Sequence, residues 1–179
     1  MIIKATRLNG VFEIESKKLT DDRGVFIKTF HADVFKEHKL QTDFKESFYS
    51  VSKKNVLRGM HFQLPPHDHA KLVYVVDGEI LDVVVDIRKE SSTFGQFYST
   101  KLSSYNAKSL YIAKGFAHGF LTLSESATVI YSITTVYEPD FDDGIRWDSF
   151  GFDWGVKNPI VSERDYDFSF LKLGYKQTK

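Results

Sequence analysis

The chain has 179 residues, no cysteine, and balanced charge, with 24 Lys plus Arg against 24 Asp plus Glu. Zero formal charge excludes the overall basic field that would attract nucleic acid or anionic membrane. The absence of cysteine excludes disulfides, thiolate metal sites and cysteine nucleophiles. No apolar run approaches the roughly 20 residues that span a bilayer, and the first residues lack a secretory-signal pattern. We therefore expect a cytoplasmic protein with one domain over residues 1–179.

Short apolar and aromatic runs between turn residues predict a mostly β protein. The expected strands are 25–30, 48–52, 56–62, 71–76, 79–87, 97–102, 109–112, 116–123 and 127–137. A short helix is expected at 31–38, an ordered loop with a helical turn at 140–154, and a polar tail, frayed or used for docking, at 172–179. The pair Asp77-Gly78 favours a tight turn and predicts that the strands on either side are antiparallel neighbours. Regularly spaced strands favour an all-β fold, a jelly-roll β-sandwich with a few short peripheral helices.

Polar residues inside apolar strands are the first candidates for a site. Arg58 and His61 have opposite parity and would face opposite sides of a regular strand, unless Gly59 marks a bulge. His118 lies between glycines and aromatic residues, a setting that also suits a core histidine bonded to a backbone carbonyl. Taken alone, these residues leave both a structural and a functional interpretation open.

Two tyrosines and two histidines allow competing interpretations. Tyr131 and Tyr137 share parity and would face one side of a regular strand, either as ordinary core residues or as part of a site. His67 and His69 form half of the pattern that holds a metal in cupin proteins. However, Lys71 shares their parity, its ammonium would repel a metal ion, and no Glu follows at the required spacing. We therefore predict no catalytic metal, with both histidines on a loop begun by two prolines.

The order of several segments along the chain is more specific than any single motif. This ordered series strongly resembles the dTDP-4-dehydrorhamnose 3,5-epimerase family over nearly the whole chain. The segments are 22–24 (DRG), 56–63 (VLRGMHFQ), 65–66 with 71–73 (PP, KLV), 86–88 (DIR), 115–120 (GFAHGF), Tyr131 with Tyr137, 144–148 (GIRWD) and 162–165 (SERD). The resemblance implies a cupin-type jelly roll that epimerises a nucleotide-linked 4-keto-6-deoxy sugar without a metal or other cofactor.

The same resemblance implies a role for each matching residue. His61 corresponds to the general base and Asp165 to the carboxylate that orients its ring. A proton beside a ketone is weakly acidic, so its removal needs a placed base and a partner for the enolate oxygen. Lys71, assisted by His118, corresponds to that partner. Tyr131 corresponds to the acid that returns a proton from the opposite face, which inverts the centre.

Substrate contacts and a partner are implied in the same way. Tyr137 corresponds to a residue lining the sugar pocket, and Arg23 and Arg58 to the residues that bind the diphosphate. Phe26 corresponds to the residue that packs on the nucleobase, and the family contributes it from the second subunit of a homodimer.

Three positions depart from the family pattern and concern the substrate. Lys28 stands where a Glu is common, and Glu46 and Phe48 stand where Gln and Asn are common. These departures leave a CDP- or GDP-linked sugar open as the substrate, and also a single-centre epimerase acting at carbon 3 or carbon 5.

More distant alternatives also remain open. They are a metal-dependent cupin oxygenase using His61, His67, His69 and His118, a noncatalytic carbohydrate-binding jelly roll, and a ketoisomerase. The co-occurrence of His61, Lys71, Tyr131 and Asp165 disfavours a mere binding module, because binding needs no base, enolate partner and acid together.

Overall fold

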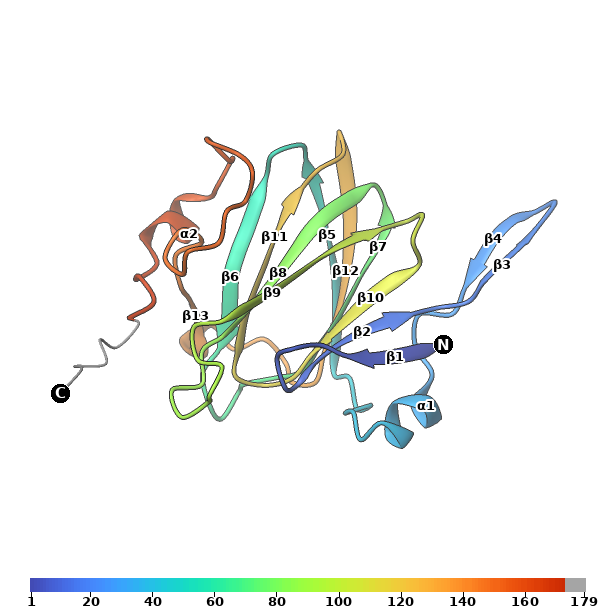
Figure 1. Cartoon of the computed structure of the whole chain (residues 1–179), viewed down its shortest axis with the longest axis horizontal. Helices are drawn as coiled ribbons and strands as arrows, with labels where there is room; N and C mark the ends of the chain where they lie inside the picture. Colours follow the sequence, from blue (N-terminus) through green and yellow to red (C-terminus); the bar gives the residue numbers. More distant parts are fainter. Residues whose placement is uncertain (173–179) are drawn as a thin grey trace.

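Two antiparallel β-sheets face each other in the structure, a computed structural model that describes residues 1–172 (Figure 1). The six-stranded sheet has the strand order β1-β2-β10-β7-β12-β5, and the five-stranded sheet has the order β13-β6-β11-β8-β9. The strands are β1 (Ile2–Ala5), β2 (Val11–Glu15), β3 (Lys18–Asp21), β4 (Gly24–Ile27), β5 (Glu46–Lys53), β6 (Leu57–Gln63), β7 (Lys71–Asp77), β8 (Glu79–Asp86), β9 (Phe97–Ser103), β10 (Lys108–Ile112), β11 (Phe116–Thr122), β12 (Ser126–Ile133) and β13 (Asp142–Gly144). This arrangement confirms the predicted all-β jelly-roll sandwich of the cupin type.

Apolar side chains from both sheets meet in the central core. Val73 and Val129 of the six-stranded sheet pack with Val84 and Phe120 of the five-stranded sheet, and each is at most 1% exposed. Burial of this apolar area is the main force that holds the sheets together. The short helix α1 (Ala32–Glu37) covers a second cluster through Phe35, at the lower edge of Figure 1.

The chain after β13 covers the outer face of the five-stranded sheet. Phe150 and Trp154 pack there against Leu57 and Val83. Strands buried on both faces have nearly continuous apolar sequences, which explains why every residue of β11 is buried. The same covering segment includes helix α2 (Glu163–Asp167), which lies beside β6.

Each expected strand has a counterpart, but β4 ends at Ile27 and not at residue 30, and β12 ends at Ile133 and not at residue 137, so the prediction that Tyr131 and Tyr137 share one regular strand is wrong. The expected helix 31–38 is α1. The loop 140–154 begins with the 3-10 turn η1 (Pro139–Phe141). The sequence did not indicate β1, β2, β3, β13 or α2. In β2 the alternation of apolar and polar residues is obscured by Glu13, a charged residue that is only 9% exposed. Its carboxylate accepts hydrogen bonds from Lys108 and Thr100, which makes this burial tolerable. Residues 173–179 of the predicted polar tail lie outside the described residues.

The predicted pairing across Asp77-Gly78 is wrong. β7 pairs with β10 and β12, whereas β8 pairs with β11 and β9 in the other sheet. The chain bends at Gly78 and crosses from one sheet to the other, so β7 and β8 contribute apolar side chains to the core from opposite sides. Within residues 1–172, no helix has both the length and the apolar character needed to cross a membrane.

We expect Gly78→Ala to destabilise the fold more than Gly151→Ala. Both glycines have φ of +78°, but a Cβ at Gly78 would clash with the Ser126 carbonyl oxygen, whereas one at Gly151 meets nothing within 4 Å. The backbone conformation alone costs about 1 kcal/mol, and the clash adds at least about 2 kcal/mol at Gly78. Chemical denaturation measures both free energies of unfolding, and equal losses would contradict the crossover geometry.

Candidate active site

A bulge in β6 turns two polar side chains toward the space between the sheets. His61 is registered with His118 and Arg58 with Phe120, so Gly59 and Met60 together oppose the single residue Gly119. A Cβ at Gly59 would lie 2.5 Å from the Gly119 Cα, so the close approach of β6 and β11 requires glycine. The bulge that the sequence left open is therefore present, and Arg58 and His61 line the same cavity despite their opposite parity.

His61 is bound to a buried carboxylate from the covering segment. Its Nε2 lies 2.8 Å from Asp165 Oδ1, while Asp165 Oδ2 accepts the Gly59 backbone N–H at 3.0 Å. Asp165 is 4% exposed and belongs to α2, whose N-cap residue Ser162 accepts its N–H. Burial alone would raise the pKa of Asp165, but hydrogen bonds from His61, Gly59 and Ser162 outweigh it and lower the pKa. An ionised Asp165 fixes the His61 proton on Nε2, which leaves Nδ1 as a base.

Lys71 and His118 lie beside His61 and come from different sheets. Lys71, on β7, donates from Nζ to the His61 carbonyl oxygen at 3.2 Å. Burial lowers the pKa of Lys71 from 10.5 to about 8, against the opposing effect of the carboxylates of Asp142 and Asp82. His118, on β11, is 3% exposed, and its Nε2 lies 2.8 Å from Asp82 Oδ2. Lys71 can therefore present a positive charge to the cavity, and His118, whose Nε2 faces Asp82, presents an Nδ1–H donor there when it is protonated on both nitrogens.

Tyr131 stands on the wall opposite His61. It belongs to β12 of the six-stranded sheet, is 8% exposed, and its hydroxyl lies 3.3 Å from Ser50 Oγ. Its ring stacks on Phe48 with centroids 4.8 Å apart and an interplanar angle of 18°. Burial raises the pKa of Tyr131 well above its usual value of 10.0, so the phenol keeps its proton at neutral pH.

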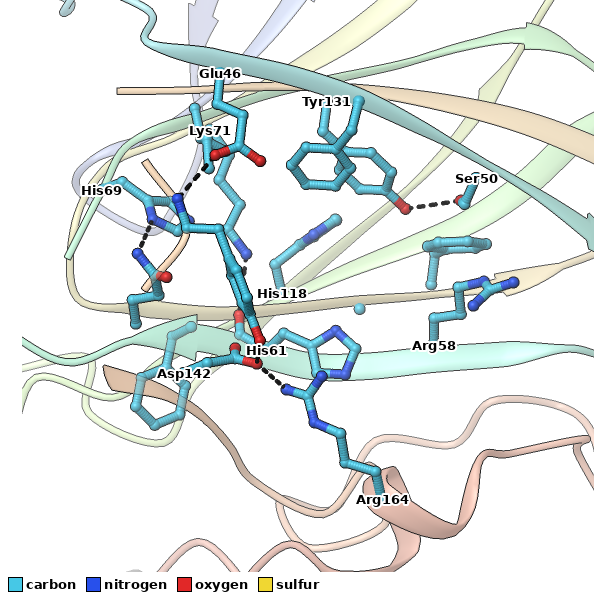
Figure 2. Close-up of a pocket in the computed structure, with 17 residues that line it drawn as sticks. Glu46, Ser50, Arg58, His61, His69, Lys71, His118, Tyr131, Asp142 and Arg164 are labelled. Atoms are coloured by element: carbon cyan, nitrogen blue, oxygen red, sulfur yellow. Dashed lines mark hydrogen bonds and ion pairs between the residues drawn. The ribbon is translucent and has the colours of Figure 1, made fainter. Parts of the chain in front are cut away.

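These groups surround one cavity of about 310 Å³, a volume suited to a small organic ligand. Figure 2 shows His61, Lys71, His118 and Tyr131 converging on it, with Arg58 toward one end and Asp142 with Arg164 toward the other. Arg58 donates from Nε to Ser52 Oγ at 2.9 Å, which ties the two sheets together beside the cavity. Most of the remaining lining is aromatic or apolar.

The structure brings most of the sequence-predicted site residues together. His61, Lys71, His118, Tyr131, Arg58, Glu46, Phe48 and Tyr137 line the cavity, and Asp165 binds His61 from behind. Arg23, Phe26 and Lys28 do not reach the cavity of their own chain. Arg23 and Phe26 lie on the β3–β4 hairpin, which projects from the body in Figure 1, and Lys28 follows it directly.

Several residues of the cavity region were not indicated by the sequence. Asp82, the partner of His118, is fully buried in an apolar strand, and attention to polar residues inside such strands would have found it. Ser50, Asp142 and Arg164 also belong to the lining. Asp142 Oδ2 accepts hydrogen bonds from the Tyr137 hydroxyl at 3.1 Å and from Arg164 at 2.6 Å. These contacts join residues from separate loops, for which no short motif exists.

His67 and His69 lie on the loop after the two prolines, as predicted. His67 packs against Phe141 outside the cavity lining, whereas His69 is part of the lining. Burial, with the charge of Lys71, lowers the pKa of His69 to about 3, so its imidazole is neutral. Within residues 1–172, no group of at least three His, Asp or Glu side chains is arranged to hold a metal ion.

Comparison with known proteins identifies the family. The family model described as dTDP-4-dehydrorhamnose 3,5-epimerase matches residues 5–172. The chain belongs to this family. It is therefore an enzyme of the epimerase class.

Three relatives illustrate the range of the family. The dTDP-4-dehydrorhamnose 3,5-epimerase of Methanothermobacter thermautotrophicus is 42% identical over 93% of this chain and 92% of its own. The crystal structure of dTDP-6-deoxy-D-glucose-3,5-epimerase from Legionella pneumophila, in complex with dTDP-4-keto-L-rhamnose, has a TM-score of 0.91 and 36% identity, covering 96% of this chain and 93% of that one. The dTDP-4-dehydrorhamnose 3-epimerase of Streptomyces niveus is 34% identical over 96% of this chain and 84% of its own.

The lowered pKa of Lys71 predicts a pH-dependent stability. In the unfolded chain this lysine titrates near 10.5 and in the folded chain near 8. Between these values the unfolded state binds more protons, so the free energy of unfolding rises with pH across the window. Lys71→Met carries no buried charge, so we expect its free energy of unfolding to exceed that of the unaltered chain at pH 8. This difference shrinks as the pH rises from 8 to 10.5.

Denaturant titrations at several pH values measure this difference. Lys36→Met, at an exposed lysine of α1, controls for the loss of one positive charge. Parallel profiles for Lys71→Met and the unaltered chain across the window would contradict the burial of a charged lysine in the cavity.

Proposed function

We propose that the chain is a 3,5-epimerase of dTDP-4-dehydro-6-deoxyglucose, a step of dTDP-L-rhamnose-type deoxysugar biosynthesis. The observation that carries the proposal is the opposition of two groups across one cavity. A carboxylate-bound imidazole, His61, lies on the five-stranded sheet, and a protonated phenol, Tyr131, lies on the six-stranded sheet. Inversion at carbon needs a base on one face and an acid on the other.

In the first half of the reaction His61 removes a proton from the carbon next to the ketone. The C–H electron pair moves into the ring to form an enolate, and the proton goes to His61 Nδ1. The resulting imidazolium is stabilised by the ionised Asp165 at 2.8 Å. The negative enolate oxygen is stabilised by Lys71 and His118, whose positions in a desolvated cavity strengthen the interaction.

In the second half Tyr131 gives its proton to the same carbon from the opposite face. The enolate electron pair forms the new C–H bond, the phenolate recovers a proton from solvent, and the His61 imidazolium releases its proton to solvent, which restores both groups. Because the high pKa of Tyr131 keeps its hydroxyl protonated, the acid is ready before the enolate forms. The same pair of steps at the other carbon flanking the ketone completes a double epimerisation.

We also propose that the enzyme is a homodimer in which each β3–β4 hairpin serves the cavity of the other copy. Val25 and Phe26 are 55% and 61% exposed on the hairpin, and an isolated hairpin with exposed apolar side chains is marginal in water. Tyr49 and Val51, on the outer face of β5, are 70% and 57% exposed and offer a docking row. A crossing hairpin would bring Arg23 and Phe26 to the diphosphate and nucleobase beside Arg58.

The whole chain is proposed to act as one jelly-roll domain in the cytoplasm. A single-centre epimerase is kept as the second candidate, because the Streptomyces niveus relative is named a 3-epimerase. Phe48, which departs from the usual amide, stacks directly on Tyr131 and is therefore placed to change which carbon receives the proton.

In deuterated water we expect the protein to exchange the protons at carbons 3 and 5 of dTDP-4-dehydro-6-deoxyglucose. His61→Ala removes the base and lowers the exchange rate by at least about 10²-fold. His67→Ala is the matched control, because that histidine lies outside the cavity lining. Carbon-resolved NMR of the recovered sugar measures both rates, and exchange that survives His61→Ala would exclude His61 as the base.

The same assay separates the alternatives. Exchange at a single carbon supports the single-centre epimerase. Stoichiometric iron or zinc by elemental analysis, with activity lost on chelation, supports the metal-dependent oxygenase, whereas full activity of the metal-free protein excludes it. Weak binding of dTDP beside tight binding of CDP or GDP would assign another nucleotide and leave the proton chemistry unchanged.

Mixing two inactive variants tests the crossing hairpin. One chain carries His61→Ala with an intact hairpin, and the other carries Arg23→Ala and Phe26→Ala with an intact base. Co-expression forms mixed dimers in which one cavity combines the intact hairpin with the intact base, so about a quarter of the sites recover full activity. Absence of recovery, with dimers present by analytical ultracentrifugation, would show that each hairpin does not serve the partner.

A further inference from the structure

The segment that carries Tyr137 lacks the support of a regular strand. β12 ends at Ile133, and residues 134–138 form bends and coil before η1. The ring nevertheless contributes to the cavity lining, although the residue is 49% exposed. A side chain on such a segment keeps one position only if other groups bind its backbone.

Gln63 binds the peptides on both sides of Tyr137. Its Oε1 accepts the Glu138 N–H at 2.7 Å, and its Nε2 donates to the Val136 carbonyl oxygen at 3.4 Å. The same Nε2 donates to the His67 carbonyl oxygen at 2.8 Å, which ties in the loop before β7. Gln63 is 5% exposed, so these hydrogen bonds are shielded from water.

Glu46 and Asp142 bind Tyr137 itself. Glu46 Oε2, from the edge strand β5, accepts the Tyr137 backbone N–H at 2.8 Å. Asp142 Oδ2, from β13, accepts the phenolic hydroxyl at 3.1 Å and is itself bound by Arg164. Figure 2 shows Glu46 and the Asp142–Arg164 pair on separate sides of the cavity. Tyr137 is therefore held by hydrogen bonds from both sheets.

We infer that Gln63 and Glu46 are positioning residues that set the place of the Tyr137 ring in the cavity wall, and through it the fit of the sugar. The inference deepens the proposed function and rests on it for the identity of the ligand. Gln63 was assigned no role by the sequence, and Glu46 was expected to contact the substrate directly. In the structure the Glu46 carboxylate is bound to the Tyr137 backbone.

Kinetics in two backgrounds tests whether the two residues act through Tyr137. Gln63→Leu and Glu46→Ala should each lower kcat/KM roughly tenfold or more, because a small displacement of a positioning group is costly. In a Tyr137→Ala background the same substitutions should change kcat/KM by less than about twofold. Loss of the same size in both backgrounds would overturn the inference.

Conservative variants separate positioning from charge and from general damage. Glu46→Gln keeps an oxygen that accepts the Tyr137 N–H, so its kcat/KM should fall less than that of Glu46→Ala. Gln63→Glu keeps the acceptor for the Glu138 N–H but loses the donors, and it provides a second variant if Gln63→Leu folds poorly.

Ser124→Ala is the matched control, because it removes side-chain hydrogen bonds to Glu79 and Ser126 in the turn before β12. An equal loss in Glu46→Gln and Glu46→Ala would assign Glu46 a charge-dependent role instead.

A spectroscopic readout decides the inference without turnover. In protein labelled with ¹³C at the tyrosine ring, the Tyr137 resonance is identified by its loss in Tyr137→Phe. It should shift or broaden in Gln63→Leu and Glu46→Ala and stay in place in Ser124→Ala. An unmoved resonance in the first two variants would overturn the inference. If the unaltered enzyme fails to exchange the dTDP sugar, the proposed function fails, but this resonance still tests the positioning.

Discussion

The Asp165 carboxylate joins two features on which the cavity depends. One oxygen accepts the backbone N–H of Gly59 inside the β6 bulge, and the other binds the His61 imidazole. The bulge turns His61 and Arg58 to the same side, and the imidazole contact sets which ring nitrogen is a base. Because Asp165 is buried and comes from the segment that covers the five-stranded sheet, packing of that segment is part of the site's construction.

The two sheets divide the proposed chemistry between them. The five-stranded sheet supplies His61 and His118, whereas the six-stranded sheet supplies Lys71 and Tyr131. Packing of the sandwich core thus sets the separation of base and acid, as a rigid scaffold should for groups that act on opposite faces of one ring. Burial also keeps Tyr131 protonated while it brings the pKa of Lys71 to about 8. One desolvated environment therefore has opposite effects on the pKa of a phenol and an ammonium.

Local patterns predicted the strands from β5 to β12, because apolar alternation and turn residues directly reflect burial, but they missed β1, β2, β3 and β13. They were insufficient where the outcome depended on distant partners. The break between two strands at Gly78 was correctly located, but the local sequence does not tell whether the next strand pairs back or crosses to another sheet. Tyr137 was placed on a regular strand that in fact ends at Ile133. The contact between His61 and Asp165 spans 104 positions of sequence, and only the family resemblance suggested it.

The two faces of β5 have different surroundings. Glu46, Phe48 and Ser50 point inward to the cavity, while Tyr49 and Val51 alternate outward and are exposed at the edge of the six-stranded sheet. Both faces share one backbone, so a displacement of β5 by a group packed on its outer face also moves Phe48 and Ser50, which contact Tyr131 on the inner face. In the proposed dimer, packing on the outer face of β5 would therefore be linked to the geometry of proton return, and substitutions on that face would be constrained by it.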